Sequence, residues 1–245
     1  MNKNEPIINL KDICFSYPGQ EPVHNKLNLK LYSTDKVGLL GPNGSGKTTL
    51  FHIIMGLLKP STGQIEIFGK DVSKEKDFGV VRQKIGLLFQ DADDQLFSPT
   101  VLEDVAFGPL NIGKSNTEAK KIAMDTLDFL GLAGFENRIT HKLSGGEKKL
   151  VSFATVLAMQ PKFLLLDEPA TALDEKTKAR LIDILHELDL PCLVISHDSE
   201  FLVKTTDSIY TMKNGKIIRD ADQQLHCHYH SHFHGASPHK HQKLD

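Results

Sequence analysis

The sequence has little cysteine, no long apolar run and almost no net charge, and each absence narrows what the protein can be. Its longest apolar stretches, residues 150–159 and 163–166, fall far short of the roughly 18 residues that a membrane-spanning helix needs. Residues 1–10 carry polar side chains where a secretory signal requires an unbroken apolar segment. The pattern therefore predicts a protein that does not cross a bilayer and stays in the cytoplasm.

The formal net charge of the 245 residues is -2, and lysine and arginine do not gather in any block. A nucleic-acid-binding protein usually carries a basic stripe that matches the phosphate backbone, so no nucleic-acid partner is predicted. The sequence has three cysteines. Cys14 and Cys192 lie in strand-like runs and are interpreted as buried apolar residues, whereas Cys227 stands apart near the carboxyl terminus.

The apolar periodicity predicts an α/β chain. Strands are predicted at residues 7–17, 27–33, 36–40, 64–68, 85–89, 163–166 and 192–195, and a hairpin with an Asn-Gly turn at residues 209–218. Helices are predicted at residues 50–58, 175–188 and between residue 100 and about 159, with a new helix after Ser144. This alternation favours parallel strands joined by crossovers. Apolar residues become scarce after Asp220, where we place the end of the folded domain.

A glycine-rich loop follows the predicted strand at residues 36–40. Residues 41–48 match the P-loop pattern and lie between a strand and a helix, as that pattern requires. Glycines let backbone N–H groups converge on phosphate oxygens, Lys47 reaches the outer phosphates, and Thr48 offers its hydroxyl to Mg²⁺. The predicted binding residues for ATP are Gly41, Pro42, Asn43, Gly44, Ser45, Gly46, Lys47, Thr48 and Thr49. A glycine-rich turn without a ligand is the alternative.

Two carboxylates end the apolar strand at residues 163–166. Open parallel sheets bind ligands at the carboxyl ends of their strands. Asp167 is therefore predicted to hold Mg²⁺, directly or through water, and Glu168 to act as general base on the attacking water. A solvated turn is the alternative reading of this pair, but the phosphate-binding loop in the same chain leaves little room for it.

Residues 143–147, Leu-Ser-Gly-Gly-Glu, resemble the signature sequence of ABC-transporter ATPases, and the resemblance covers residues 1 to about 220. It implies an α/β P-loop NTPase of the ABC-ATPase fold, with a RecA-like parallel sheet core, an antiparallel β subdomain and an α-helical signature subdomain at about residues 98–160. It also implies a head-to-tail pair of ATPase subunits. Ser144, Gly145 and Gly146 of one subunit would close on ATP held by the other, which is either an identical chain or a paralogue.

The same resemblance implies roles for four residues outside these motifs. Tyr17 is placed to stack on adenine, and Gln90 to contact Mg²⁺ and the attacking water. Asp174 lies in the loop that crosses the dimer, and His197, at the end of a strand, is placed to contact the γ-phosphate. A core tyrosine and a structural histidine are the alternatives for Tyr17 and His197.

Two positions depart from the family pattern. Ala170 stands where the family often has threonine, and Leu150 stands where many members have arginine. Neither change removes a catalytic group, so the changes bear only on the details of dimer contact and rate.

Residues 90–97 resemble the ATPases of energy-coupling factor (ECF) transporters, in particular the cobalt and nickel branch. That resemblance implies two membrane partners, a transmembrane coupling subunit and a substrate-binding subunit, and a peripheral position on the cytoplasmic face of the membrane. The acidic residues of this segment could meet a basic coupling helix. A solvated acidic loop is an equally simple interpretation.

Histidine dominates the end of the chain, where seven of the twelve histidines lie in the last 20 residues. His226, His228, His230, His232 and His234 alternate with other residues. Imidazole suits nickel, copper, zinc and cobalt, so residues 221–245 are predicted to form a flexible tail that binds a transition metal. A solvated tail without function is the alternative.

These features together favour an ATPase that energises import of nickel or cobalt through separate membrane subunits. A second hypothesis keeps the ECF ATPase but makes the substrate a vitamin. An ABC ATPase acting on DNA or ribosomes is less favoured, because only one P-loop and a short helical insert are present. A metal-storage protein without enzymatic activity would explain the histidines alone.

Overall fold

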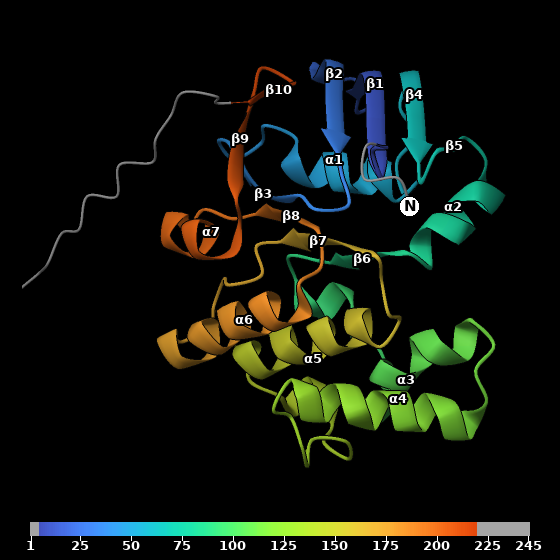
Figure 1. Cartoon of the computed structure of the whole chain (residues 1–245), viewed down its shortest axis with the longest axis vertical. Helices are drawn as coiled ribbons and strands as arrows, with labels where there is room; N and C mark the ends of the chain where they lie inside the picture. The colour runs from blue at the N-terminus through green and yellow to red at the C-terminus, as the bar shows by residue number, and fades with distance from the viewer. Residues whose placement is uncertain (1–4, 220–245) are drawn as a thin grey trace, which may run out of the picture.

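The first part of the chain folds into an antiparallel sheet. The computed structural model describes residues 5–219, and within them this sheet has the strand order β2-β1-β4-β5. The strands are β1 (Ile8–Ser16), β2 (Pro22–Leu31), β4 (Thr62–Ile67) and β5 (Lys70–Asp71). Along β2 buried and exposed residues alternate, as expected for a sheet that packs on one face and meets solvent on the other. Figure 1 shows β1, β2 and β4 side by side at the top of the molecule.

A second sheet, called the central sheet below, has the order β10-β9-β3-β8-β7-β6. Its strands are β3 (Lys36–Leu40), β6 (Ile85–Leu88), β7 (Phe163–Asp167), β8 (Cys192–Ile195), β9 (Ser208–Lys213) and β10 (Lys216–Arg219). All neighbouring pairs are parallel except the hairpin of β9 and β10. The predicted parallel strands and the Asn-Gly hairpin are therefore confirmed.

Strands β6, β7 and β8 of the central sheet are buried on both faces, and their side chains divide the core in two. Phe163 and Leu165 of β7 pack with the antiparallel sheet and with α1 (Lys47–Ile54), which lies between the two sheets in Figure 1. Leu164 and Leu166 point the other way and pack with the helices below. A strand covered on both faces must be apolar at every position, which explains the unbroken run Phe-Leu-Leu-Leu.

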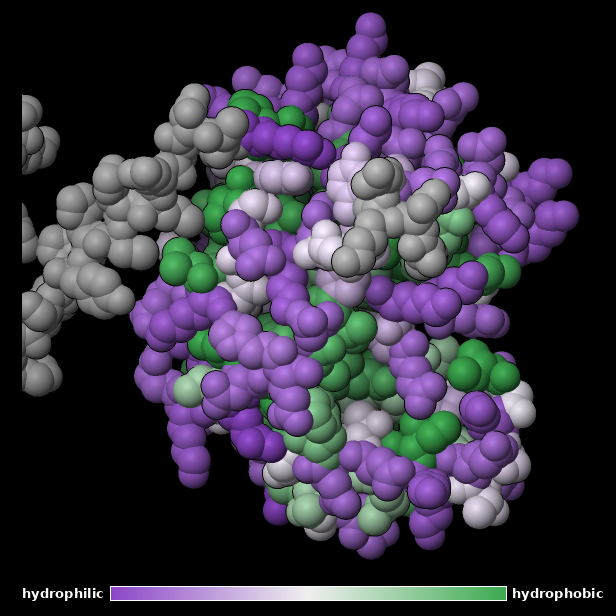
Figure 2. Space-filling view, in the orientation of Figure 1, coloured by the Kyte–Doolittle hydropathy of each residue, from purple (hydrophilic) through white to green (hydrophobic). Residues whose placement is uncertain are grey.

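The helices below the central sheet include the predicted helical insert. They are α3 (Val101–Asn111), α4 (Asn116–Phe129), α5 (Gly145–Leu157), α6 (Glu175–Leu188) and α7 (Ser199–Thr205), with short 3-10 helices η1 (Ala92–Asp94) and η2 (Thr140–Lys142). Thr100, Ser115 and Ser144 each begin a helix with a capping box. On the face seen in Figure 2, hydrophobic side chains reach the surface between the sheets and these helices. No helix within residues 5–219 is long and apolar enough to cross a membrane.

Several predicted boundaries were wrong. Helix α1 begins at Lys47 instead of residue 50 and ends at Ile54 instead of residue 58. Gly56 stops it early with a positive φ of 69°. Strand β2 also begins at Pro22, five residues before the predicted strand. Helix α2 (Glu75–Arg82) was not predicted at all, because it is short and has only two buried residues to mark a helical period.

The predicted domain end near Asp220 and the predicted histidine tail, with Cys227, lie outside the described residues. Cys192 is buried as predicted, and desolvation raises its pKa to about 12. Cys14 is only partly buried, which corrects the prediction of a buried residue, because its thiol accepts a hydrogen bond from the backbone N–H of Lys26 at the sheet surface.

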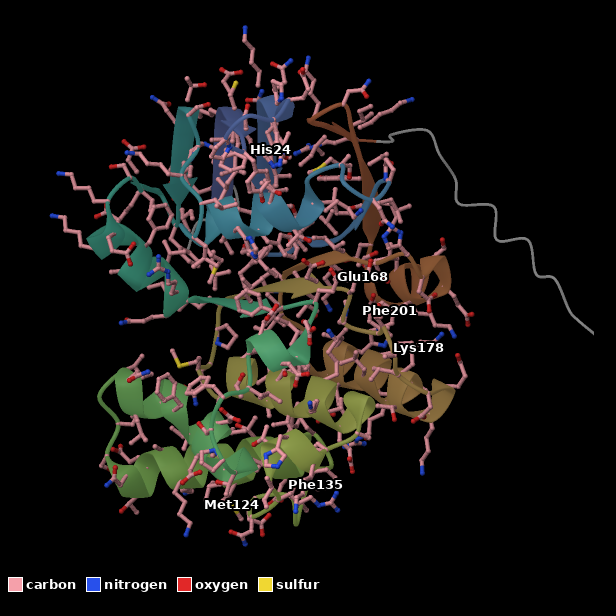
Figure 3. The ribbon with its side chains drawn as sticks, turned by 180° about the vertical axis from the view of Figure 1, so that it is seen from behind. His24, Met124, Phe135, Glu168, Lys178 and Phe201 are labelled. Carbon is pink, nitrogen blue, oxygen red and sulfur yellow. The ribbon has the colours of Figure 1, made fainter. Side chains whose placement is uncertain are left out.

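His24 on β2 is fully buried beneath the glycine-rich loop, and neither of its ring nitrogens has a hydrogen-bond partner among residues 5–219. A methyl group added at Gly46 would lie 2.7 Å from His24 Cε1, so the ring supports the loop directly. Figure 3 marks His24 in the upper part of the molecule. Burial lowers its pKa to about 4, because the charged imidazolium would lose its hydration without gaining a partner.

His24 is expected to make the fold sensitive to acid. The pKa of His24 is about 6.5 in the unfolded chain and about 4 in the folded protein, so between these pH values the unfolded state binds a proton that the folded state does not. His24 should therefore leave the free energy of unfolding unchanged above pH ~6.5 and lower it by about 2 kcal/mol at pH ~5. Urea unfolding of wild type and His24→Met at both pH values measures it. An equal pH dependence in the two proteins would contradict the assignment.

Candidate functional site

The loop between β3 and α1 forms a cradle of backbone N–H groups at the start of a helix. Gly44 and Gly46 have positive φ angles of 76° and 99°, a conformation that favours glycine. At Gly46 a side chain would also meet the strand below, since an added Cβ would lie 2.6 Å from Val23 Cγ1. At Gly44 no atom lies within 4 Å of such a Cβ. The loop therefore needs glycine at position 46 for space and at position 44 for conformation alone.

Lys47 is the first residue of α1 and bends back over the loop. Its Nζ donates hydrogen bonds to the backbone carbonyls of Gly41 at 2.8 Å and Pro42 at 3.1 Å. Burial lowers the pKa of Lys47, and the nearby carboxylates of Glu168 and Asp167 oppose that effect. The ammonium is thus held at the helix start, where an anionic ligand would be favoured.

Thr48 and Asp167 join the loop to the end of β7. Thr48 Oγ1 donates a hydrogen bond to Asp167 Oδ2 at 2.7 Å. Asp167 is almost fully buried, which raises its pKa, while the bond from Thr48 acts in the opposite direction. A hydroxyl and a carboxylate oxygen side by side are hard oxygen ligands of the kind that Mg²⁺ prefers. The residues that the sequence assigns to magnesium therefore fit it.

Glu168 follows Asp167 with a strained positive φ of 47°. Its Oε2 accepts hydrogen bonds from Thr171 Oγ1 at 3.1 Å and from the backbone N–H of His197 at 3.4 Å. Its Oε1 is buried without a hydrogen bond within residues 5–219, and His197 Nε2 lies 3.5 Å away. Glu168 therefore holds one fixed oxygen and offers another at the edge of the central sheet, where Figure 3 marks it.

Thr171 is a site residue that the sequence analysis missed. Its contact with Glu168 spans three residues of a tight turn. The only feature of the sequence that could have identified Thr171 is its hydroxyl two residues after Asp-Glu-Pro, next to Ala170, where the family often has threonine.

A pocket of about 470 Å³ brings most of the predicted residues together. It is lined by Tyr17, Gln20, Val23, Asn43, Gly44, Ser45, Gly46, Lys47, Thr48, Thr49, Gln90, Asp167, Glu168, Ile195 and His197. Gln20, Val23 and Ile195 were not predicted. Tyr17 is tied to the loop by a 3.2 Å hydrogen bond between its hydroxyl and Thr49 Oγ1, and its ring packs edge-on against Phe15.

The signature residues do not line this pocket. Ser144 is the N-cap of α5, where its hydroxyl accepts a 3.3 Å hydrogen bond from Glu147 N. Asp174 caps α6 in the same way and accepts from Thr177 N at 2.9 Å. Gly145 lines a neighbouring pocket of about 720 Å³, which Thr48, Gln90 and Asp167 also line. The start of α5 therefore faces the same side of the molecule as the phosphate-binding loop.

No cluster of histidine, cysteine, aspartate and glutamate suited to a further metal occurs among the described residues. The predicted transition-metal ligands His226, His228, His230, His232 and His234 lie outside the described part of the chain.

Comparison with known proteins gives consistent matches. The family model for the ABC transporter matches residues 24–171. The energy-coupling factor transporter ATP-binding protein EcfA of Methanothermobacter thermautotrophicus is 43% identical over 218 residues, 87% of this chain and 70% of the relative. The structure of cbiO1 from Clostridium perfringens, part of the ABC transporter complex cbiONQ, has a TM-score of 0.78 at 33% identity and covers 88% of each chain. A dimeric ATP-binding cassette in a post-hydrolysis state with ADP and Pi has a TM-score of 0.79 at 30% identity, covering 86% of this chain and 97% of that one.

The two loop glycines are expected to differ in their tolerance of alanine. Gly44→Ala should cost about 1–2 kcal/mol of folding free energy, because only the positive φ is unfavourable there. Gly46→Ala should cost roughly 2 kcal/mol more, because the methyl group also overlaps Val23 and His24. Urea unfolding without nucleotide measures both losses free of any effect on binding. Equal losses would show that space at Gly46 does not limit the fold.

Proposed function

The chain belongs to the ABC transporter family, and we propose from this premise that it drives import of nickel or cobalt through separate membrane subunits of an ECF-type transporter. As a member of this family it is an ATP-binding subunit and an ATPase. The observation that carries the catalytic part of the proposal is the buried, unbonded Oε1 of Glu168 beside the phosphate-binding loop.

Binding of ATP rests on the loop and on Tyr17. The backbone N–H groups of residues 41–49 and the positive end of α1 receive the phosphates, and Lys47 exchanges its bonds to Gly41 and Pro42 for phosphate oxygens. The ring of Tyr17 stacks on the adenine, an apolar contact that needs no particular hydrogen-bond pattern. Its hydroxyl bond to Thr49 ties the ring to the glycine-rich loop.

Three residues hold Mg²⁺ in this proposal: Thr48, Asp167 and Gln90. When bound, the ion would supply positive charge that offsets the charge developing on the phosphate oxygens. Thr48 and Asp167 already lie within hydrogen-bond distance of each other, so their oxygens need little rearrangement to share one ligand. Gln90 lines both pockets at this point and would be the third residue to hold the metal and orient the attacking water.

Glu168 acts as the general base. Thr171 and the backbone of His197 fix one carboxylate oxygen, which leaves Oε1 to accept a proton from water at the γ-phosphate. His197 is half exposed, with Nε2 3.5 Å from Oε1, and in this proposal its ring contacts the γ-phosphate. The rigid turn keeps the base from swinging away between turnovers.

A complete site requires a second ATPase subunit. Ser144, Gly145 and Gly146 mark a helix start that suits a phosphate group, yet none of them lines the pocket of about 470 Å³ formed by the glycine-rich loop of their own chain. In a head-to-tail pair these residues close on the partner's ATP, and Asp174 lies at the crossing between the subunits. The partner is an identical chain or a paralogue.

The membrane subunits would dock near the segment after β6. Phe97 and Phe107 pack edge to face at 4.7 Å and are 66% and 45% exposed, which is unusual for aromatic side chains. The acidic residues Asp91, Asp93 and Asp94 precede them. An apolar pair beside an acidic rim suits a coupling helix with apolar and basic faces, and such docking places the chain on the cytoplasmic face of the membrane.

Two observations in the sequence support a metal cargo: the likeness of residues 90–97 to the cobalt and nickel branch, and the alternating histidines of residues 226–234. Imidazole binds both ions, so the tail would buffer or sense the transported metal. Import of a vitamin by the same machinery is the second candidate, and in that case the histidines are incidental.

Replacing Glu168 should separate binding from hydrolysis. In the assembled complex, Glu168→Gln is expected to keep ATP binding and lower kcat by about 100-fold or more, because the amide cannot accept the proton. Glu187→Gln, an exposed position on α6, is the matched control and should leave kcat unchanged. Steady-state phosphate release and nucleotide binding measure the two effects. Wild-type turnover in Glu168→Gln would refute the proposed base.

Uptake measurements identify the cargo. Cells that lack this chain should lose accumulation of labelled nickel or cobalt, and wild-type protein but not Glu168→Gln should restore it. A chain that lacks residues 221–245 should keep its ATPase rate and import less metal when the metal is scarce. Unchanged metal uptake in the deletion strain would exclude a metal cargo, and a parallel loss of vitamin uptake would favour the second candidate.

A further inference from the structure

Lys149 is a buried lysine that the mechanism above does not use. It lies on α5, five residues after Ser144, and is only 5% exposed. Its Nζ donates hydrogen bonds to the backbone carbonyl of Phe89 at 3.1 Å and to that of Gln90 at 2.6 Å. The ammonium therefore holds the chain at the point where β6 ends and the Gln90 loop begins.

Burying this charge is unfavourable, so the contact needs a physical reason. Desolvation lowers the pKa of Lys149, and the carboxylates of Asp167, Asp91 and Glu168 oppose the effect. In return Lys149 helps to keep Asp167 ionised, against the burial that raises the pKa of that carboxyl. One side chain thus contacts the Gln90 backbone and acts electrostatically on the carboxylate assigned to Mg²⁺.

A second side chain ties the same segment to α5 from the other side. Gln95 Oε1 accepts a hydrogen bond from Phe89 N at 3.2 Å. Gln95 Nε2 donates to Ser152 O at 3.1 Å and to Thr155 Oγ1 at 2.9 Å. Both the N–H and the C=O of Phe89 are therefore held by groups anchored on the helix that begins at the signature.

The neighbouring lysine makes a different contact. Lys148 is also on the first turns of α5, but its Nζ pairs with the exposed carboxylate of Asp93 at 2.5 Å. An ion pair with one partner in solvent contributes little. Lys148 thus provides a matched comparison of the same side chain, one residue away, without backbone contacts.

We propose that Lys149 is a positioning residue for ATP hydrolysis: it fixes Gln90 to the signature helix, so that Gln90 meets the metal and water only when that helix is in place. Lys149 does not touch ATP. The inference rests on the proposed role of Gln90 and is independent of the transported substrate.

A double-mutant cycle in the complete transporter complex tests this role. Lys149→Met keeps an unbranched side chain of similar length and removes both the charge and the donor. It should lower kcat by about 10-fold at saturating Mg-ATP while KM for ATP changes by less than about 2-fold. In a Gln90→Ala background the same change should lower kcat by less than about 2-fold, because the residue it positions is gone. Lys148→Met should stay within about 2-fold of wild type.

The outcomes distinguish support for the inference, failure of the inference and failure of the proposed role of Gln90. Equal losses from Lys149→Met in both backgrounds would overturn the inference, and so would a loss of ATP affinity that matches the loss of kcat. Wild-type kcat in Gln90→Ala alone would refute the role of Gln90, which is a distinct failure.

Lys149→Gln, which keeps a neutral donor, provides a second variant should Lys149→Met fold poorly, and its kcat should lie between those of wild type and Gln90→Ala. A kcat equal to wild type in Lys149→Gln would also overturn the proposal.

Discussion

The parallel pairing of β3, β8, β7 and β6 is the constraint on which the site depends. Because the four strands run in one direction, their carboxyl ends lie along one edge of the central sheet. Each end delivers a different group: the glycine-rich loop after β3, Asp167 and Glu168 at β7, Gln90 after β6 and His197 after β8. The hydrogen bond from Thr48 to Asp167 crosses two of these ends over 119 residues of sequence. A shift in the register of these strands would move Thr48 and Asp167 apart and break this hydrogen bond.

The same edge also concentrates buried charged side chains. Lys47 and Lys149 are buried cations, and Asp167 and Glu168 are buried anions. Each lysine is satisfied by two backbone carbonyls, whereas Glu168 keeps one oxygen without a hydrogen bond among the described residues. A buried polar atom left unbonded is unfavourable, and such atoms are rare in folded proteins unless they have a function. Under the proposed function, Glu168 Oε1 is the atom that accepts the proton from water.

Local signals in the sequence predicted the parts of the site that a short segment defines by itself. The loop at residues 41–49 and the pair after β7 are of this kind, since strand, turn chemistry and acidic residues follow one another directly. Thr171 and Lys149 could not be found in this way, because their roles depend on partners that only folding brings near. Helices α2 and α7 were not predicted for another reason: eight and seven residues are too few to establish a helical period. The roles of Tyr17, Gln90, Asp174 and His197 stay predictions, although three of the four side chains line the pocket.

The signature residues do not line the pocket of about 470 Å³, so under the proposed function hydrolysis depends on two subunits and a signal must pass between them. In the proposed pair Ser144 at the start of α5 would contact the partner's nucleotide, whereas Asp167 ends β7 of the central sheet and Glu168 follows it. A signal between them must pass through atoms in contact. Helix α5 is stiff because its hydrogen bonds run along its axis, so a displacement at its first turn reaches Lys149 little diminished. From Lys149 two hydrogen bonds lead to the backbone of Phe89 and Gln90, and Gln90 lines the pocket with Asp167. This short path gives a physical reason for a lysine at a position where its burial is unfavourable.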